Sequence, residues 1–188
     1  MQIKPWRTAI HRKNTSATLK TVLKMDRLSI RDNILDYGCG HGYDLNYLKE
    51  LNFNVTGYDK YIKTYSNDDY SKHKYTKILC FYVLNTIADK EERITVLESI
   101  LKLLTDNGKV YIAVRSLKEL TSFKNKNFEP YNDGVVTRID TFQKYFSKEE
   151  LEELLYKNFN DIQFHYIKFN NKTLFIELTK QMEVHNEN

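Results

Sequence analysis

The stretch from residue 33 to residue 59 constrains the fold more than any other part of this 188-residue chain. It opens with the apolar pair Ile34 and Leu35, which is typical of a buried parallel strand. Glycines then follow at alternate positions: Gly38, Gly40 and Gly42. Leucines recur next at helical spacing: Leu45, Leu48 and Leu51. A second strand over 55–58 ends at Asp59. Strand, glycine loop, helix and strand in this order predict an open parallel α/β sheet.

The spacing of the glycines indicates what kind of ligand the loop approaches. Glycines let the backbone turn sharply and come close to a ligand without Cβ atoms in the way. The dinucleotide fingerprint places two residues before its third glycine, whereas here the pattern is Asp36-x-Gly38-x-Gly40-x-Gly42. This form resembles motif I of the class I S-adenosylmethionine-dependent methyltransferases. The alternative interpretation is the strand–helix turn of a Rossmann-like domain that binds no cofactor.

The resemblance implies an α/β, Rossmann-like class I methyltransferase fold, with a mostly parallel sheet, a C-terminal antiparallel hairpin and helices on both faces. It implies S-adenosyl-L-methionine as cofactor. Asp36 is then placed to bond the loop amides or the cofactor's ammonium group, and Asp59 to accept hydrogen bonds from ribose hydroxyls. The expected cofactor-binding residues are Asp36, Tyr37, Gly38, Cys39, Gly40, Gly42, Asp59, Lys60 and Tyr82.

Composition excludes several classes of protein. Hydrophobic residues make up 41% and charged residues 29%, as in a soluble globular domain, and no apolar stretch approaches the ~20 residues of a membrane helix. The net charge of +4 permits a nucleic-acid partner without the dense basic clusters that would indicate one. Cys39 and Cys80 lack metal-ligand spacing, so we expect no metal and two reduced thiols in a cytoplasmic protein. The oligomeric state is not indicated.

The other elements divide the chain into an arm with a helix (1–32), the cofactor-binding domain (33–180) and a polar tail (181–188). Thr15 or Ser16 predicts the start of a helix bearing Leu19, Val22 and Leu23. The polar segment 60–76 predicts a third unit shortened to a loop or small strand. Its Asp68 or Asp69 either contacts the adenine amine or is simply solvated, and we favour the latter.

Further along, a buried strand is expected over 77–84. A helix capped by Asp89 is expected to end at Asn107-Gly108, and the next strand to span 110–114. The long segment 116–146 predicts a lid or substrate-binding loop. Ser147 and Glu150 form a capping box, and Asn170-Asn171 predicts the turn of a C-terminal hairpin.

Candidate substrate residues come from three places. The basic N-terminal segment offers Arg7, His11 and Arg12. Either it is a flap that contacts an anionic substrate, or its Trp6 and Ile10 pack on the body while the cations are solvated. His11 is the candidate base. Asn85 follows a strand at the ligand-binding edge and is the other catalytic candidate, although Thr86-Ile87 lacks the prolines of amino-methylating DNA enzymes. Thr141 and Gln143 follow the long segment and are candidate substrate contacts.

Four stretches resemble a narrower group, the methyltransferases associated with bacterial DNA phosphorothioation systems. These stretches are Arg7-Thr8-Ala9-Ile10-x-Arg12, Gly57-Tyr58-Asp59 with Tyr61, Tyr82-Val83-Leu84-Asn85 with Glu91-Glu92-Arg93, and Thr137 with Thr141-Phe142-Gln143-x-Tyr145-Phe146. The chain departs from that group at Lys60 and Asp140, where proline and glycine are expected.

The sequence therefore predicts an S-adenosylmethionine-dependent methyltransferase that acts on nucleic acid or a nucleotide-like substrate, with DNA modification as its context. Two alternatives stay open, a methyltransferase of small metabolites and a catalytically silent cofactor-binding partner subunit. An oxidoreductase ranks below these because the glycine spacing differs from the dinucleotide fingerprint.

Overall fold

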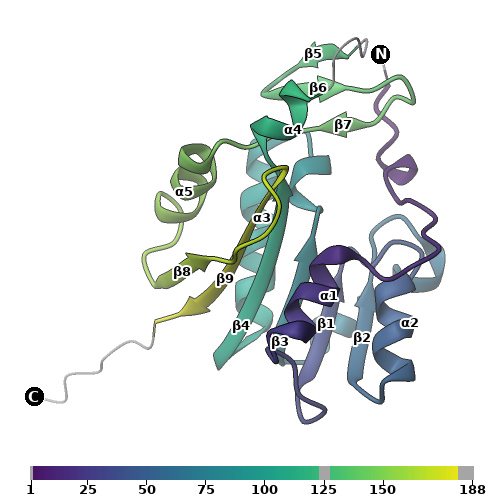
Figure 1. Cartoon of the computed structure of the whole chain (residues 1–188), viewed down its shortest axis with the longest axis vertical. Coiled ribbons are helices and arrows are strands. Elements are labelled where there is room, and N and C mark those ends of the chain that lie inside the picture. The colour runs from purple at the N-terminus through teal and green to yellow at the C-terminus, as the bar shows by residue number, and fades with distance from the viewer. Residues whose placement is uncertain (1, 123–127, 182–188) are drawn as a thin grey trace, which may run out of the picture.

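The protein is built on a six-stranded mixed sheet in the order β2-β1-β3-β4-β9-β8 (Figure 1). The structure, a computed structural model, describes residues 2–122 and 128–181. The strands are β1 (Asn33–Tyr37), β2 (Asn54–Tyr58), β3 (Tyr75–Phe81), β4 (Leu104–Arg115), β8 (Ile162–Tyr166) and β9 (Thr173–Lys180). The first four strands pair in parallel, and β9 and β8 add an antiparallel hairpin beside β4. The predicted fold class is confirmed.

Helices cover both faces of this sheet and divide the core in two. They are α1 (Ala17–Lys24), α2 (Tyr43–Glu50), α3 (Lys90–Leu103), α4 (Leu117–Thr121) and α5 (Lys148–Tyr156). Leu19 of α1 and Leu48 of α2 pack on one face, together with Ile34 of β1. Leu97 of α3 and Leu154 of α5 pack on the other. Neighbouring residues of a strand point to opposite faces, so the continuous apolar strands serve both cores.

The starts of α1, α3 and α5 follow from local capping, as predicted. The Ser16 hydroxyl accepts from the Leu19 amide at 3.1 Å, and the Asp89 carboxylate accepts from the Glu91 amide at 2.8 Å. Ser147 and Glu150 form the complete capping box of α5. Each cap satisfies amide groups that have no partner within the helix, which fixes the start of the helix from sequence alone.

Three predicted boundaries were wrong. Helix α3 ends at Leu103 instead of Asn107-Gly108, because Leu104 turns to an extended backbone and pairs with Tyr75 in the sheet. Strand β3 ends at Phe81, since Tyr82 adopts a φ of 61° that leaves the strand direction. Leu51 is not on the buried stripe of α2. It lies beyond the last turn as the C-cap and is 41% exposed.

The described residues of the segment 116–146 contain regular elements as well as loops. They include α4 and a separate antiparallel sheet of β5 (Glu129–Tyr131), β6 (Gly134–Val136) and β7 (Phe142–Gln143), seen at the top of Figure 1. The N-terminal arm, residues 2–16 with the 3-10 turn η1 (Pro5–Arg7), runs from this small sheet to α1. The segment 60–76 is short, as predicted, with two 3-10 turns, η2 (Lys63–Tyr65) and η3 (Asp68–Lys72).

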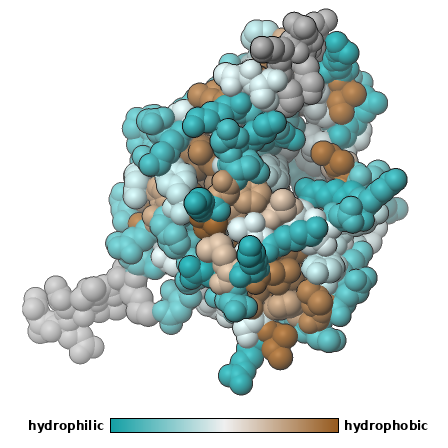
Figure 2. Space-filling model, in the orientation of Figure 1, coloured by the Kyte–Doolittle hydropathy of each residue, from teal (hydrophilic) through white to brown (hydrophobic). Residues whose placement is uncertain are grey.

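The surface shows how the hydrophobic side chains are distributed over the molecule. On the face in Figure 2, hydrophobic side chains form separate patches among hydrophilic ones. Among the described residues, no helix has the length and apolarity that crossing a bilayer requires. Residues 182–188 of the predicted polar tail lie outside the described residues.

Candidate active site

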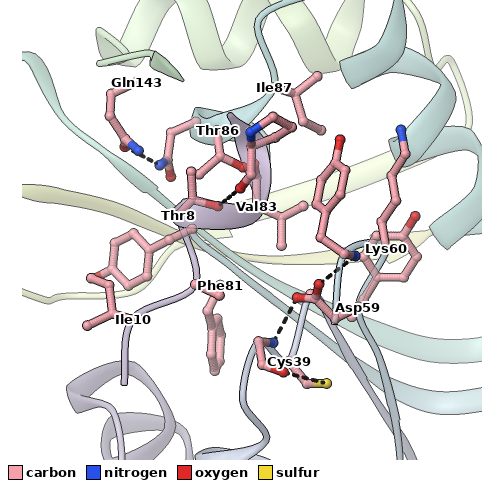
Figure 3. Close-up of a pocket in the computed structure, with 18 of the residues that line it drawn as sticks. Thr8, Ile10, Cys39, Asp59, Lys60, Phe81, Val83, Thr86, Ile87 and Gln143 are labelled. Atoms are coloured by element: carbon pink, nitrogen blue, oxygen red, sulfur yellow. Dashed lines mark hydrogen bonds between the residues drawn. The ribbon is translucent and has the colours of Figure 1, made fainter. Parts of the chain in front are cut away.

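A cavity of about 630 Å³ opens at the carboxyl ends of β1, β2 and β3 (Figure 3). Its wall combines the N-terminal arm, the glycine loop, the residues after β2, and the 3-10 turn η4 (Leu84–Thr86) that follows β3. Gln143 of β7 and Thr173 of β9 complete the wall. Open α/β sheets bind ligands at this edge, and the volume is that of a small-molecule site.

The glycine loop is fastened to the end of β2. The amides of Gly38 and Cys39 both donate to the Tyr58 carbonyl, at 2.7 and 3.0 Å. The Gly40 amide donates to Asp59 Oδ2 at 2.9 Å. Of the two predicted roles for Asp36, bonding the loop amides is therefore not observed, because Tyr58 and Asp59 take these amides instead.

Gly40 leaves space on the cavity side of this loop. Its φ is +56°, a left-handed conformation that glycine adopts without the steric cost of a side chain. A Cβ placed there would meet only the Ala9 Cβ, at 3.6 Å. The loop therefore forms an open backbone cradle beneath the arm.

Asp59 joins the loop to the segment after β2. Its Oδ1 accepts hydrogen bonds from the amides of Tyr61 and Ile62, at 2.9 and 3.2 Å, and its Oδ2 accepts one from the Gly40 amide. A carboxylate offers about four acceptor positions, so three amide bonds leave capacity for one further donor in the cavity.

Asp36 is a buried acid of the cavity wall whose carboxyl is not fully hydrogen-bonded within the described residues. It is 4% exposed, and its Oδ2 has no hydrogen-bond partner among the described residues. Burial first, and then the nearby Asp44 carboxylate, raises the pKa of Asp36 to about 8, against the opposing effect of Arg12. A buried carboxyl without a partner costs stability, which is typical of a group that receives its partner from a ligand.

A pair of side-chain amides connects the two sheets at the cavity wall. Asn85 Nδ2 donates to Gln143 Oε1 at 3.0 Å, and the Lys144 amide donates to the Asn85 carbonyl at 2.7 Å. Both side chains are buried, and Asn85 Oδ1 has no partner within the described part of the chain. β7 thereby sets the orientation of the Asn85 side chain.

The arm crosses the mouth of the cavity and is tethered at both ends. Lys4 Nζ pairs with Asp140 at 2.6 Å, and Arg12 pairs with Asp44 at 3.3 Å. The ring of His11 stacks on His41 with centroids 3.6 Å apart. Trp6 and Ile10 are 50% and 63% exposed and line the cavity, so neither side chain is part of the buried core.

The cavity brings together most of the predicted residues. Those that line it are Arg12, Asp36, Tyr37, Gly38, Cys39, Gly40, Asp59, Lys60, Tyr82, Asn85 and Gln143. The structure places four others outside the lining: Arg7, His11, Gly42 and Thr141. Arg7 donates to the Ile139 carbonyl, Thr141 bonds the Thr137 hydroxyl, and Gly42 is the N-cap of α2.

Sequence reasoning missed several lining residues. Arg115 ends β4 and Glu119 follows in α4, so the rule that ligands gather at the carboxyl ends of strands would have found this pair. Lys172 lies in the hairpin turn before β9 and Thr173 is the first residue of β9, and no local pattern marks them. Among the described residues no group of three side chains is arranged to hold a metal ion.

Comparisons with known proteins agree with this geometry. The family model described as "Methyltransferase domain" matches residues 7–161. The sequence matches none of the curated proteins.

Solved structures share the fold at low identity. An S-adenosylmethionine-dependent methyltransferase from Bacteroides fragilis in complex with S-adenosyl-L-homocysteine is 18% identical, with a TM-score of 0.64 over 91% of this chain and 80% of that one. One from Clostridium acetobutylicum is 14% identical, with a TM-score of 0.64 over 94% of each chain. The 1,6-didemethyltoxoflavin-N1-methyltransferase of Burkholderia thailandensis is 16% identical, with a TM-score of 0.62 over 88% and 79%.

The family match covers most of the chain, including the glycine loop, Asp59 and the arm from Arg7 onward. The similar structures give the same fold independently. The chain therefore belongs to the methyltransferase domain family.

Proposed function

We propose that the protein is an S-adenosylmethionine-dependent methyltransferase that acts on a small molecule. The observation that carries the proposal is the cavity at the strand ends, where an open glycine cradle lies beside the buried carboxyl of Asp36 and the acceptor Asp59. The family match supports methyl transfer, and the B. fragilis structure holds S-adenosyl-L-homocysteine.

The residues present fit this cofactor. Asp36 has an unpartnered buried oxygen that suits the ammonium group of a methionine moiety, and Gly40 leaves the backbone open to close approach. Asp59 keeps one acceptor position that suits a ribose hydroxyl. Tyr37, Cys39, Lys60 and Tyr82 would complete the walls.

The chain's own contribution to the reaction is mainly placement. When bound, S-adenosylmethionine supplies a methyl group that is already activated by its sulfonium. The protein then has to hold the acceptor in line and exclude water. Asn85, oriented by Gln143, is the polar side chain that we assign to positioning the acceptor. His11 receives no role here because it does not line the cavity and its ring is stacked on that of His41.

A small acceptor is favoured over nucleic acid. The arm and the small sheet enclose the site, which suits a molecule that enters the cavity. The B. thailandensis relative has a small molecule, 1,6-didemethyltoxoflavin, bound. The relationship to phosphorothioation systems stays a prediction from the sequence motifs.

Calorimetric titration of the purified protein tests the cofactor assignment. We expect S-adenosylmethionine and S-adenosylhomocysteine to bind with micromolar affinity and NAD not to bind. Gly40→Val should abolish binding, because a branched side chain would fill the cradle. Asn52→Val is the matched control, since Asn52 is exposed, has a φ of 62° and is remote from the cavity lining. Unchanged affinity in Gly40→Val, or binding of NAD alone, would contradict the assignment.

A further inference from the structure

Of the four described Lys and Arg side chains that line the cavity, three are already paired with carboxylates. Arg12 pairs with Asp44 at 3.3 Å, Lys60 pairs with Glu92 at 2.7 Å, and Arg115 pairs with Glu119. Asp59 and Asp89 add two more carboxylates to the lining. Within the described part of the chain, Lys172 is the one lining cation without an ion pair.

This charge pattern opposes an anionic acceptor. Phosphate recognition uses cations that are free to form charge-assisted hydrogen bonds, usually in clusters. Here a phosphate would have to displace a carboxylate from each arginine that it approached. The lining therefore disfavours nucleotides and nucleic acid, although the net charge of the whole chain is +4.

The mouth of the cavity is apolar instead. Four large side chains with apolar surface line it and stay about half exposed: Trp6 at 50%, Ile10 at 63%, Tyr43 at 41% and Tyr61 at 43%. Exposed apolar groups that converge on one cavity are typical of a ligand-binding site, because a ligand removes their surface from water. Figure 3 shows Ile10, Phe81 and Val83 among the apolar side chains that line the cavity.

The arm holds the only tryptophan of the chain at this mouth. Trp6 lies between the tether of Lys4 to Asp140 and the tether of Arg12 to Asp44. Because the arm is fixed at Lys4 and at Arg12, little conformational entropy is lost when a flat ring stacks on the indole of Trp6.

We propose that the methyl acceptor is a small, uncharged aromatic compound that stacks on Trp6 and packs against Ile10 at the mouth of the cavity. The proposal rests on the proposed function, because it assigns the acceptor end of the same site.

The test uses the full chain saturated with S-adenosylhomocysteine, so that the cofactor region is filled. Three uncharged aromatic probes are titrated by calorimetry: 6-aminoquinoline, 2-naphthol and indole. Adenosine 5′-monophosphate and a single-stranded deoxyribonucleotide dodecamer are the anionic probes. We expect at least one uncharged probe to bind with a Kd below about 1 mM, and at least tenfold more tightly than either anion.

Substitutions of Trp6 test whether the uncharged probe binds at the mouth of the cavity. Trp6→Ala should weaken the uncharged probe about fivefold, whereas Trp6→Phe, which keeps a ring, should retain most of the affinity. Ile30→Ala is the matched control, because Ile30 is 67% exposed and does not line the cavity. It should change nothing.

Removing the carboxylate that pairs with Arg115 provides a second test, which measures the affinity for an anion. Glu119→Gln removes the charge that pairs with Arg115 and should raise the affinity for adenosine 5′-monophosphate several-fold. This gain is expected only if ion pairing is what excludes the anion.

The proposal is overturned if no uncharged probe binds, if the dodecamer or the nucleotide binds more tightly, or if Trp6→Ala has no effect. Failure of the proposed function gives a different result, because S-adenosylhomocysteine would then not bind in the first step.

Discussion

Asp36 couples the stability of the protein to pH. Its pKa is raised to about 8 by burial, whereas an aspartate in an unfolded chain titrates near 4. Between these values the folded state binds one more proton than the unfolded state, so this group's contribution to the free energy of unfolding falls as pH rises through that window. The slope is at most about 1.4 kcal/mol per pH unit.

Asp36→Asn should remove this dependence. We expect the variant to gain stability over the wild-type protein as pH rises from 5 to about 8, measured by urea unfolding at several pH values. Asp106→Asn, an exposed change at the start of β4, is the control and should show no such trend. A constant difference between Asp36→Asn and the wild type would mean that Asp36 is already ionised in the folded protein.

The same carboxyl should make cofactor binding depend on pH. A cationic ammonium group favours ionised Asp36, so binding below about pH 8 must release the proton that the free protein carries. Affinity for S-adenosylmethionine should therefore rise from pH 6 to pH 8 and then level off. Calorimetry in buffers of different ionisation enthalpy counts the released proton directly. No proton release at pH 7 would place the ammonium group elsewhere.

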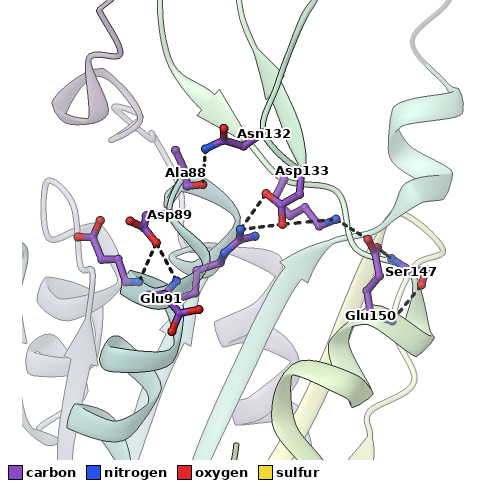
Figure 4. A network of polar contacts seen from close by, with 10 residues as sticks. Ala88, Asp89, Glu91, Asn132, Asp133, Ser147 and Glu150 are labelled. Carbon is purple, nitrogen blue, oxygen red and sulfur yellow. Dashed lines mark hydrogen bonds and ion pairs between the residues drawn. The ribbon is translucent and has the colours of Figure 1, made fainter. Parts of the chain in front are cut away.

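An ionic network around two buried cations joins the small sheet to the helices of the main sheet. Asp133 lies in the turn between β5 and β6. The guanidinium of Arg93, in α3, donates to both oxygens of its carboxylate, at 2.7 and 2.8 Å (Figure 4). Lys144, just after β7, pairs with Asp133 at 3.8 Å and with Glu150 of α5. Arg93 and Lys144 are buried, so both depend on these partners.

Removing Asp133 should therefore loosen the small sheet. Asp133→Ala leaves the Arg93 charge buried without its partner, and we expect a loss of about 2 kcal/mol in the free energy of unfolding. This is less than the roughly 3–5 kcal/mol typical of fully buried pairs, because Asp133 is partly exposed. Asp69→Ala breaks the exposed pair with Lys72 and is the control. Equal effects of the two changes in urea unfolding would show that the network is solvated.

The whole molecule combines one large sheet and one small one, and their stabilities should differ. Strands β1, β3, β4 and β9 lie within a sheet covered on both faces, whereas β5 is exposed at every residue. Local opening needs less free energy where few apolar contacts break.

Hydrogen exchange should resolve these two levels. We expect the slowest-exchanging amides in β1, β3 and β4, because only global unfolding exposes them. The amides of β5 and β6 should exchange about tenfold faster or more. Saturating S-adenosylhomocysteine should slow exchange in the glycine loop and the arm. Uniform protection across both sheets would show that they unfold as one unit.

Some features follow from the sequence because their causes are local. The caps of α1, α3 and α5 depend on residues within three positions of each other, and the glycine loop and Asp59 lie within one strand–helix–strand unit. The periodicity of the apolar residues fixed the alternation of strand and helix in the same way. Most of the predicted cofactor residues consequently line one cavity.

Other features were decided only by the path of the whole chain. Asn85 meets Gln143, Lys4 meets Asp140 and Arg93 meets Asp133 across 58, 136 and 40 positions. The end of α3 was misplaced for the same reason, since pairing of Leu104 with Tyr75 in the sheet outweighed the local turn signal at Asn107-Gly108. The sequence by itself determined the glycine loop and its link to Asp59, because short-range backbone and capping interactions define them. The tertiary structure decided the rest of the cavity wall. Contacts between segments far apart along the chain pair Arg12 with Asp44 and Lys60 with Glu92, and they bring Trp6 and Ile10 to the cavity.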